Sequence, residues 1–306
     1  MQKDTILYGV ILIIILWIII EQKLLMITKH TMSSSKLPTQ TGEIDFVLLA
    51  DLHNRTFGRN NNRLIRKIDN LSPDFIIIAG DMINKKDICY PGSTFTLIEQ
   101  LAKKYKIYYA YGNHEHRLER IGREASSEWT QEDKKYYSTW VEYKDRLRKQ
   151  KVEFLDNQSA MISLPSCKLK ITGVTLEHEY FEFNATKELK KSHLDSLLGE
   201  SSKDYFQLLI AHNPMYFKAY AEWGADLTLS GHLHGGMMRL PGIGGVLSPQ
   251  AKFFPKYDMG KHNHNEKYLV VSRGLGSHSI MPRIFNIPEI IYMKLQYEKS
   301  ASESNQ

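Results

Sequence analysis

The sequence predicts an α/β fold preceded by an N-terminal membrane helix. Continuous apolar runs at residues 44–50, 75–79 and 107–111 are typical of strands buried in a parallel sheet. Residues 60–71 and 91–104 lie between these runs and repeat apolar side chains at helical spacing. The second half of the chain is richer in strand-like segments, so we expect two sheets rather than one.

Length and composition set the outer limits. The 306 residues, with 42% hydrophobic content, can build a sizeable core, as one large domain or as two smaller ones. The net charge is +6, but basic and acidic residues are interspersed, so no nucleic-acid partner is expected. Cys89 and Cys167 form no CxxC motif and leave the redox compartment open.

The N-terminal segment is nearly continuous in aliphatic residues from 6 to 20. A bilayer is crossed by about 20 apolar residues, and residues 24–27 extend the run past Lys23, whose amine can reach the headgroups. A secretory signal peptide competes with this interpretation, but it requires a small-residue cleavage site, and none precedes Ser33. We expect an uncleaved membrane anchor at residues 1–30, a polar linker at 31–43 and a globular domain at 44–306. The side of the membrane is left open.

Polar side chains follow each of the first three strands at its carboxyl end. Asp51 and His53 come after the first strand, Asp81 after the second, and Asn113 and His114 after the third. Open α/β sheets place their sites at this edge. Each group alone has an ordinary structural explanation, such as an aspartate that caps a helix. Three such groups in succession favour a shared site.

Two later strands end in the same way. Residues 205–211 lead to His212, and Pro214 forces the intervening Asn213 out of helical geometry. Residues 225–229 lead to the sequence SGHLHGG, in which His232 and His234 are one residue apart and point the same way at a strand exit. Two imidazoles directed into one small space suit a metal ion.

The candidate ligands supply oxygen and nitrogen but no thiolate. This donor set suits two divalent ions such as Mn, Fe, Zn or Co, whereas a single zinc ion needs only three or four ligands. A carboxylate such as that of Asp81 can bridge two ions about 4 Å apart. The predicted ligands are Asp51, His53, Asp81, Asn113, His212, His232 and His234.

Five motifs in order, DLH, GD, GNHE, AHNP and GHLHGG, resemble the calcineurin-like metallophosphoesterase superfamily over about residues 44–296. The resemblance implies a four-layer α/β/β/α sandwich with two metal ions. Of the candidate metals, we favour manganese. The resemblance assigns the first ion to Asp51, His53, Asp81 and His234. It assigns the second to Asp81, Asn113, His212 and His232, and it makes His114 the catalytic acid.

The anchor, the sequence SRGLG at 272–276 and residues 282–290 are similar to the membrane-anchored YkuE/YaeI-like branch of that family. Some relatives of this branch hydrolyse a nucleotide-linked lipid pyrophosphate. The resemblance therefore implies hydrolysis of a phosphoric ester or anhydride near a membrane, by in-line attack of a hydroxide that bridges the two metals. The substrate is phosphorylated and could be lipid-linked or nucleotide-linked; monoester, diester and pyrophosphate cleavage all remain open.

Other functions and residues compete with this interpretation. A catalytically silent relative could use the same fold as a binding module at the membrane. A nuclease is a third alternative, but this sequence lacks the concentrated basic and aromatic residues of a nucleic-acid groove. Arg273 suits either a substrate phosphate or a structural salt bridge. His262 and His264 lack a preceding strand exit. Residues 115–151 form either a cap over the site or an amphipathic surface helix.

Overall fold

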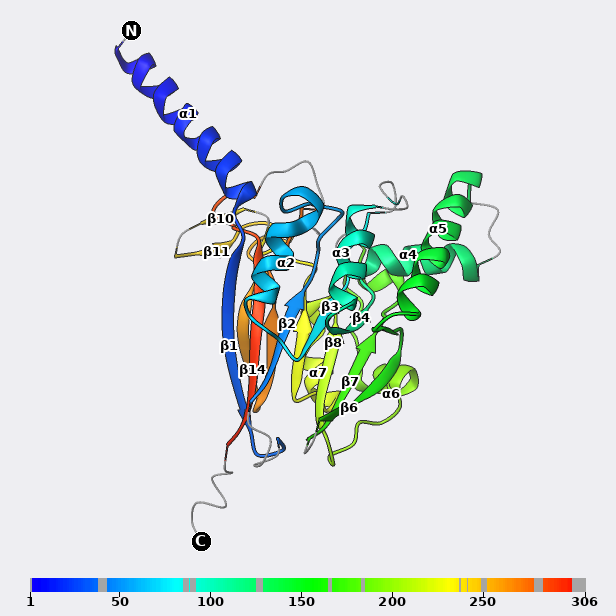
Figure 1. The fold of residues 1–306 in the computed structure, drawn as a ribbon. Helices are drawn as coiled ribbons and strands as arrows, with labels where there is room; N and C mark the ends of the chain where they lie inside the picture. Colours follow the sequence, from blue (N-terminus) through cyan, green and yellow to red (C-terminus); the bar gives the residue numbers. More distant parts are fainter. Residues whose placement is uncertain are drawn as a thin grey trace, which may run out of the picture.

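The structure is a computed structural model that describes residues 2–37, 43–84, 88, 92–124, 129–164, 167–182, 185–236, 238–240, 242–248, 252–277 and 283–298. Cys89 lies outside these ranges. Two six-stranded sheets face each other (Figure 1). The first has the order β1 (Met26–Ser34), β14 (Glu289–Tyr297), β2 (Ile44–Leu49), β3 (Phe75–Ala79), β4 (Lys106–Ala110) and β5 (Val152–Leu155). The second has the order β12 (Gly260–His264), β13 (Lys267–Val271), β9 (Leu227–Ser230), β8 (Phe206–Ala211), β7 (Cys167–Val174) and β6 (Gln158–Leu164).

Helices cover the outer faces of both sheets. The helices on the first sheet are α2 (Asn62–Asp69), α3 (Ser93–Ala102), α4 (Asn113–Arg123) and α5 (Gln131–Arg148). The second sheet carries α6 (Lys191–Leu198) and α7 (Phe217–Trp223). A small hairpin of β10 (Arg239–Leu240) and β11 (Gly244–Gly245) stands apart, and short 3-10 turns occur at η1 (Arg59–Asn61), η3 (His178–Tyr180) and η4 (Pro214–Tyr216).

The strand pattern explains the layers. Successive side chains of a strand point to opposite faces. On β2, Phe46 and Leu48 lie in the core between the two sheets, whereas Val47 and Leu49 lie in the core under the helices of the first sheet. A third core joins β8 to α6 and α7. The predicted four-layer α/β/β/α sandwich is confirmed.

The region from 115 to 151 contributes to a layer rather than to a single surface helix. It forms the two helices α4 and α5, and Trp140 and Tyr143 of α5 are completely buried in the core against the first sheet. The bulky aromatic residues of this segment therefore stabilise the sandwich.

The polar segment after the apolar helix differs from the expected linker. Residues 26–34 form β1, which pairs in parallel with β14 from Met26 opposite Glu289 to Ser34 opposite Tyr297. The strand is at the edge of the sheet and most of its side chains are partly exposed, so polar residues are tolerated there. Only Leu24 and Leu25 separate it from helix α1 (Gln2–Lys23).

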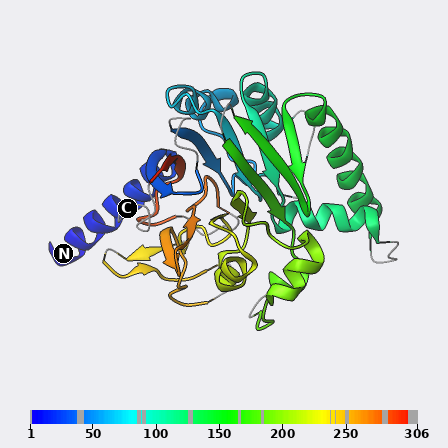
Figure 2. The same cartoon turned by 90° about the horizontal axis from the view of Figure 1, so that it is seen from below.

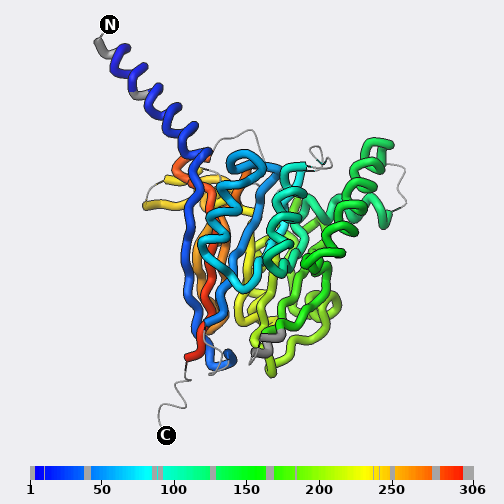
Figure 3. Tube along the Cα trace, viewed as in Figure 1, coloured from blue at the N-terminus to red at the C-terminus, as the bar shows by residue number. Residues whose placement is uncertain are grey.

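Helix α1 is long and apolar enough to cross a membrane. Its Asp4–Lys23 segment has a mean hydropathy of 2.3, and only 6% of the segment is buried, unlike the core helix of a soluble domain. Figure 3 shows the helix projecting from the sandwich without lying on either sheet.

Strand direction places α1 at a particular edge. Strands β2, β3 and β4 are parallel, so their carboxyl ends share one edge of the first sheet. Strand β14 is antiparallel to β2, and β1 is parallel to β14. The beginning of β1, and with it the end of α1, therefore lies at the edge where β2 and β3 end (Figure 1).

We predict that Leu48→Ala lowers the free energy of unfolding by about 2–5 kcal/mol, because Leu48 is completely buried between the sheets and alanine leaves a cavity. Urea unfolding in detergent measures the change. The control is Met161→Ala on β6, where the side chain is 47% exposed and the expected change is within about 0.5 kcal/mol. Equal losses in both variants would contradict the layer assignment.

Candidate metal centre

The residues predicted as ligands come from the ends of five strands. Asp51 and His53 follow β2, Asp81 follows β3, His212 follows β8, and His232 and His234 follow β9; Asn113 and His114 begin α4 after β4. Within the described part of the chain, three groups of side chains have ligand atoms within 4.8 Å of one another. They are Asp51, His53 and His234; His53, Asp81 and His114; and Asp81, His212 and His232.

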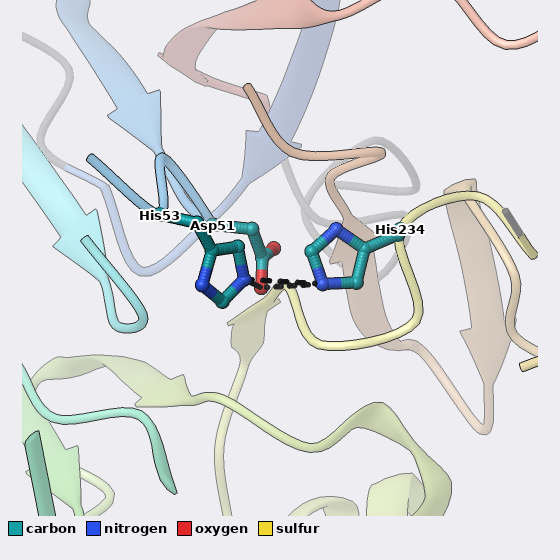
Figure 4. A group of neighbouring side chains, drawn as sticks. All are labelled: Asp51, His53 and His234. Carbon is teal, nitrogen blue, oxygen red and sulfur yellow. Dashed lines mark hydrogen bonds and ion pairs between the residues drawn. The ribbon is translucent and has the colours of Figure 1, made fainter. Parts of the chain in front are cut away.

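The first group surrounds one carboxylate oxygen (Figure 4). Atom Oδ1 of Asp51 lies 3.6 Å from Nε2 of His234 and 4.0 Å from Nε2 of His53. The two Nε2 atoms are 3.3 Å apart. All three residues are buried, so their donor atoms face one another rather than water.

A second group surrounds Asp81. Its Oδ2 lies 3.1 Å from Nε2 of His212 and 4.0 Å from Nε2 of His114. Nε2 of His212 is also 3.8 Å from Oδ1 of Asp51. Two buried carboxylates thus share one imidazole.

Hydrogen bonds orient two of the histidines. Nδ1 of His212 donates to the carbonyl oxygen of Ala79 at 2.6 Å, and Nδ1 of His53 faces the amide oxygen of Asn84 at 2.7 Å. A neutral imidazole that donates through Nδ1 keeps a lone pair on Nε2, the arrangement typical of metal-binding histidines. The amide oxygen of Asn113 is buried and has no hydrogen-bond partner among the described residues. These donors fit a cation.

The two buried carboxylates are stabilised by positive charge beside them. Burial raises the pKa of Asp51 to about 7, and Asp81 adds to the rise, although His212 opposes it. Burial also acts to raise the pKa of Asp81, but the imidazoles of His212 and His114 outweigh it and hold that pKa well below its usual value. Burial lowers the pKa of His212, but Asp81 and Asp51 overcome it and raise the value to about 10. A proton on His212 thus supplies the charge that a metal ion would replace.

The backbone of the site is strained. Non-glycine residues rarely adopt positive φ angles, and strained conformations cluster at functional sites. Five of the predicted ligands adopt them: Asp51 (52°), His53 (48°), Asp81 (52°), His232 (71°) and His234 (51°). At Gly274, an added Cβ would lie 2.6 Å from Cβ of Asp51, so only glycine allows this loop to approach the carboxylate.

Sequence reasoning gave no role to Glu115, although it belongs to the GNHE motif. Its Oε2 accepts hydrogen bonds from the backbone N–H groups of Asp81 (2.8 Å) and Gly112 (3.0 Å). Its Oε1 accepts from the N–H of Met82 and the hydroxyl of Tyr109. Burial, with Asp81 second, raises the pKa of Glu115. One carboxylate therefore joins the loop after β3 to the start of α4.

Arg283 was also missed. Its guanidinium is buried and donates to the carbonyl oxygens of Gly276 (2.9 Å), Arg273 (2.5 Å) and Asn286 (3.3 Å). Burial, reinforced by Arg55, lowers its pKa to about 9. These bonds hold the loop that contains Gly274 against Asp51. No local sequence pattern could have indicated them.

Three further basic residues named in the sequence lie outside the groups of potential ligands found among the described residues. Arg273 pairs with Glu289, with its Nη2 3.0 Å from Oε2, so the structural salt bridge is formed. His262 and His264 lie on the edge strand β12, and neither belongs to a potential metal group among the described residues.

A family model and several sequence relatives match this chain. The model of the family described as "Calcineurin-like phosphoesterase" matches residues 44–236. The uncharacterized metallophosphoesterase YkuE of Bacillus subtilis is 24% identical over 90% of this chain and 87% of its own length. A Danio rerio transmembrane protein with a metallophosphoesterase domain is 24% identical over 85% of this chain and 55% of its own length. Among solved structures, the phosphopantetheinyl hydrolase of Mycobacterium tuberculosis is 14% identical, with a TM-score of 0.42 over 78% of this chain and 90% of its own.

A four-layer sandwich with carboxylates and imidazoles gathered at its strand ends, together with the family match and the sequence relatives, defines a metal-dependent phosphoester hydrolase. The chain belongs to the calcineurin-like phosphoesterase family.

We predict that Glu115→Gln lowers metal affinity by about 10–100-fold, because the amide turns a donor toward backbone groups that also donate. Titration of Mn²⁺, followed by the electron paramagnetic resonance signal of the free ion, measures the change. Glu124→Gln, at the exposed end of α4, is the matched control. Unchanged affinity in Glu115→Gln would show that this carboxylate does not position the site.

Proposed function

We propose that the chain is a dinuclear phosphoester hydrolase anchored in a membrane. The position of Asp81 carries the proposal, because it is the carboxylate that belongs to two of the three groups of potential ligands found among the described residues. A carboxylate with two oxygens can serve both ions of a pair. In this proposal one ion is held by Asp51, His53, Asp81 and His234, and the other by Asp81, Asn113, His212 and His232.

The two ions, with manganese favoured over iron, zinc and cobalt, would supply a hydroxide nucleophile at neutral pH and neutralise charge on the phosphoryl oxygens. The side chains of this chain set the geometry. The N–H of His232 donates to both oxygens of Asp51 at 3.1 Å, which leaves the carboxylate directed toward His53 and His234. The ligand-bearing loops therefore need little rearrangement on loading.

His114 is the proposed proton donor to the leaving oxygen. Its backbone N–H donates to Oδ1 of Asp81 at 2.9 Å, which fixes the start of α4 beside the carboxylate. Its ring lies 5.1 Å from that of His53, and its side chain is 15% exposed, more than that of His53 or of His212. An acid at the open side of the site can reach a leaving group that points to solvent.

The proposed substrate is a phosphorylated molecule near the membrane, linked to a lipid or a nucleotide. Helix α1 supports membrane attachment by its length and hydropathy. The carboxylate of Glu21 near its end accepts hydrogen bonds from the backbone of Phe285 and Asn286. A segment that contributes such a buried contact to the domain is better interpreted as an uncleaved anchor than as a signal peptide.

We predict that Asp81→Asn abolishes both tight binding of two metal equivalents and Mn-stimulated hydrolysis of bis-p-nitrophenyl phosphate, because a neutral amide cannot replace a shared carboxylate. Metal content by plasma mass spectrometry and product absorbance measure the two effects. Wild-type protein that binds two equivalents but hydrolyses neither this diester nor the corresponding monoester would favour the silent binding module.

We also predict that His114→Ala lowers turnover by about 10²–10⁴-fold while metal content stays near that of the wild type, because the variant loses a proton donor and keeps the proposed ligands. The control is His262→Ala, since this histidine lies on β12 outside the groups of potential ligands. Parallel loss of metal and activity would instead make His114 a ligand.

A further inference from the structure

Exposed apolar side chains gather beside the base of α1. Among the described residues outside α1, the exposed large hydrophobic side chains are Met161 and five others. These five have exposed fractions from 40% to 71%, and we call them the apolar patch: Leu240, Ile243, Phe253, Phe254 and Phe285. All of them except Phe253 line a hollow of about 650 Å³. Such a gathering of exposed apolar residues typically marks an interaction surface.

The apolar patch is attached to the end of the helix. The backbone N–H groups of Phe285 and Asn286 donate to the two oxygens of Glu21, which is completely buried. Figures 1 and 2 show the β10–β11 hairpin, which carries Leu240 and precedes the Phe253–Phe254 turn, beside the base of α1 in both directions of view.

Further contacts attach the end of α1 to the sandwich. The guanidinium of Arg55 donates to the side-chain and backbone oxygens of Gln22. Only Leu24 and Leu25 lie between α1 and β1, and Leu25 is buried in the core. The direction of α1 therefore determines which face of the sandwich meets the bilayer.

The apolar patch is also joined to the metal centre. The side-chain amide of Asn286 donates to the carbonyl oxygen of His234 at 2.5 Å. Arg239 donates to the carbonyl oxygen of Gly235 in the same loop at 2.7 Å and pairs with Asp258. Asn286 thus contacts both the anchor and the loop that carries two of the proposed ligands.

Two aromatic residues of the apolar patch are held in an unfavourable conformation. Phe254 has a φ angle of 49° and Phe285 one of 53°, a region that bulky residues rarely adopt. Strain of this kind persists where the surrounding structure maintains it for a function. Here it accompanies rings that are more than half exposed.

We infer that the apolar patch lies in the interfacial layer of the same bilayer that α1 crosses, so that the metal centre faces the lipid headgroups. This inference rests on the proposed anchoring by α1. Lys252 and Lys256 flank Phe253 and Phe254 in the sequence. Cations beside aromatic residues favour anionic lipid surfaces. The proposed substrate class follows from this placement: a phosphoester in the headgroup layer, with its lipid chains still in the bilayer.

The test uses the full chain reconstituted in vesicles of phosphatidylcholine and phosphatidylglycerol with bromine near the headgroup end of the acyl chains. Cys89 and Cys167 are replaced by serine, and an environment-sensitive fluorophore is placed at Phe253→Cys. We expect a blue shift and strong quenching by bromine, because an interfacial residue lies about 5–10 Å below the headgroup boundary. Ile243→Cys provides a second position in case the first variant folds poorly.

The matched control is Met161→Cys, an exposed apolar position on β6 outside the apolar patch, where no quenching is expected. Equal quenching at 253 and 161, or none at 253 and 243, would overturn the inference. A blue shift without bromine quenching would also overturn it and would indicate a protein partner or a second copy of the chain.

The anchor is monitored separately through Trp17 in α1, as the difference in bromine quenching between the wild type and Trp17→Phe. Unquenched Trp17 would contradict the anchoring on which the inference rests. Quenched Trp17 with an unquenched label at both patch positions would contradict the inference alone. Neither readout depends on hydrolysis, so a wild type without activity would count against the proposed function only.

Discussion

The structure depends on the burial of two carboxylates, Asp51 and Asp81, side by side at the junction of its two sheets. A buried anion is unfavourable unless it is paired and hydrogen-bonded. The N–H groups of His232 and His114 each donate to one of these carboxylates, and His212 lies between them. Even so, burial and mutual repulsion raise the pKa of Asp51 to about 7. The remaining charge is the reason that the arrangement suits cations better than it suits a closed core.

That constraint explains the loops around the site. A direct strand-to-helix turn would carry the ligands away from the junction, so the chain accepts left-handed conformations at Asp51, Asp81 and His232. Glu115 and Arg283 then hold these loops through hydrogen bonds to backbone groups. Neither residue is proposed as a ligand, yet each contacts backbone that surrounds one of the buried carboxylates.

The sequence was sufficient for the strands that run through the core, because burial on both faces produces continuous apolar runs such as residues 75–79. Since those strands are parallel, their carboxyl ends lie at one edge of each sheet, and the candidate ligands follow these ends in the sequence. Strand β1 was missed because an edge strand carries polar residues such as Thr28 and Lys29. The contact of Glu21 with Asn286 spans 265 positions and depends on the register of β1 with β14, which no local pattern encodes.

The register of β1 with β14 links helix α1 to the site. If residues 31–43 were a flexible linker, the domain could turn freely, and membrane attachment would say nothing about substrate access. Because β1 instead continues almost directly from α1 and runs antiparallel to β2, the end of α1 must lie beside the loop that begins at Asp51. The same topology that brings the carboxylates together therefore brings them to the face from which the helix emerges. For the proposed membrane-anchored hydrolase, the sheet would set the orientation of the site, and that orientation supports the proposal of a phosphoester that remains in the membrane surface.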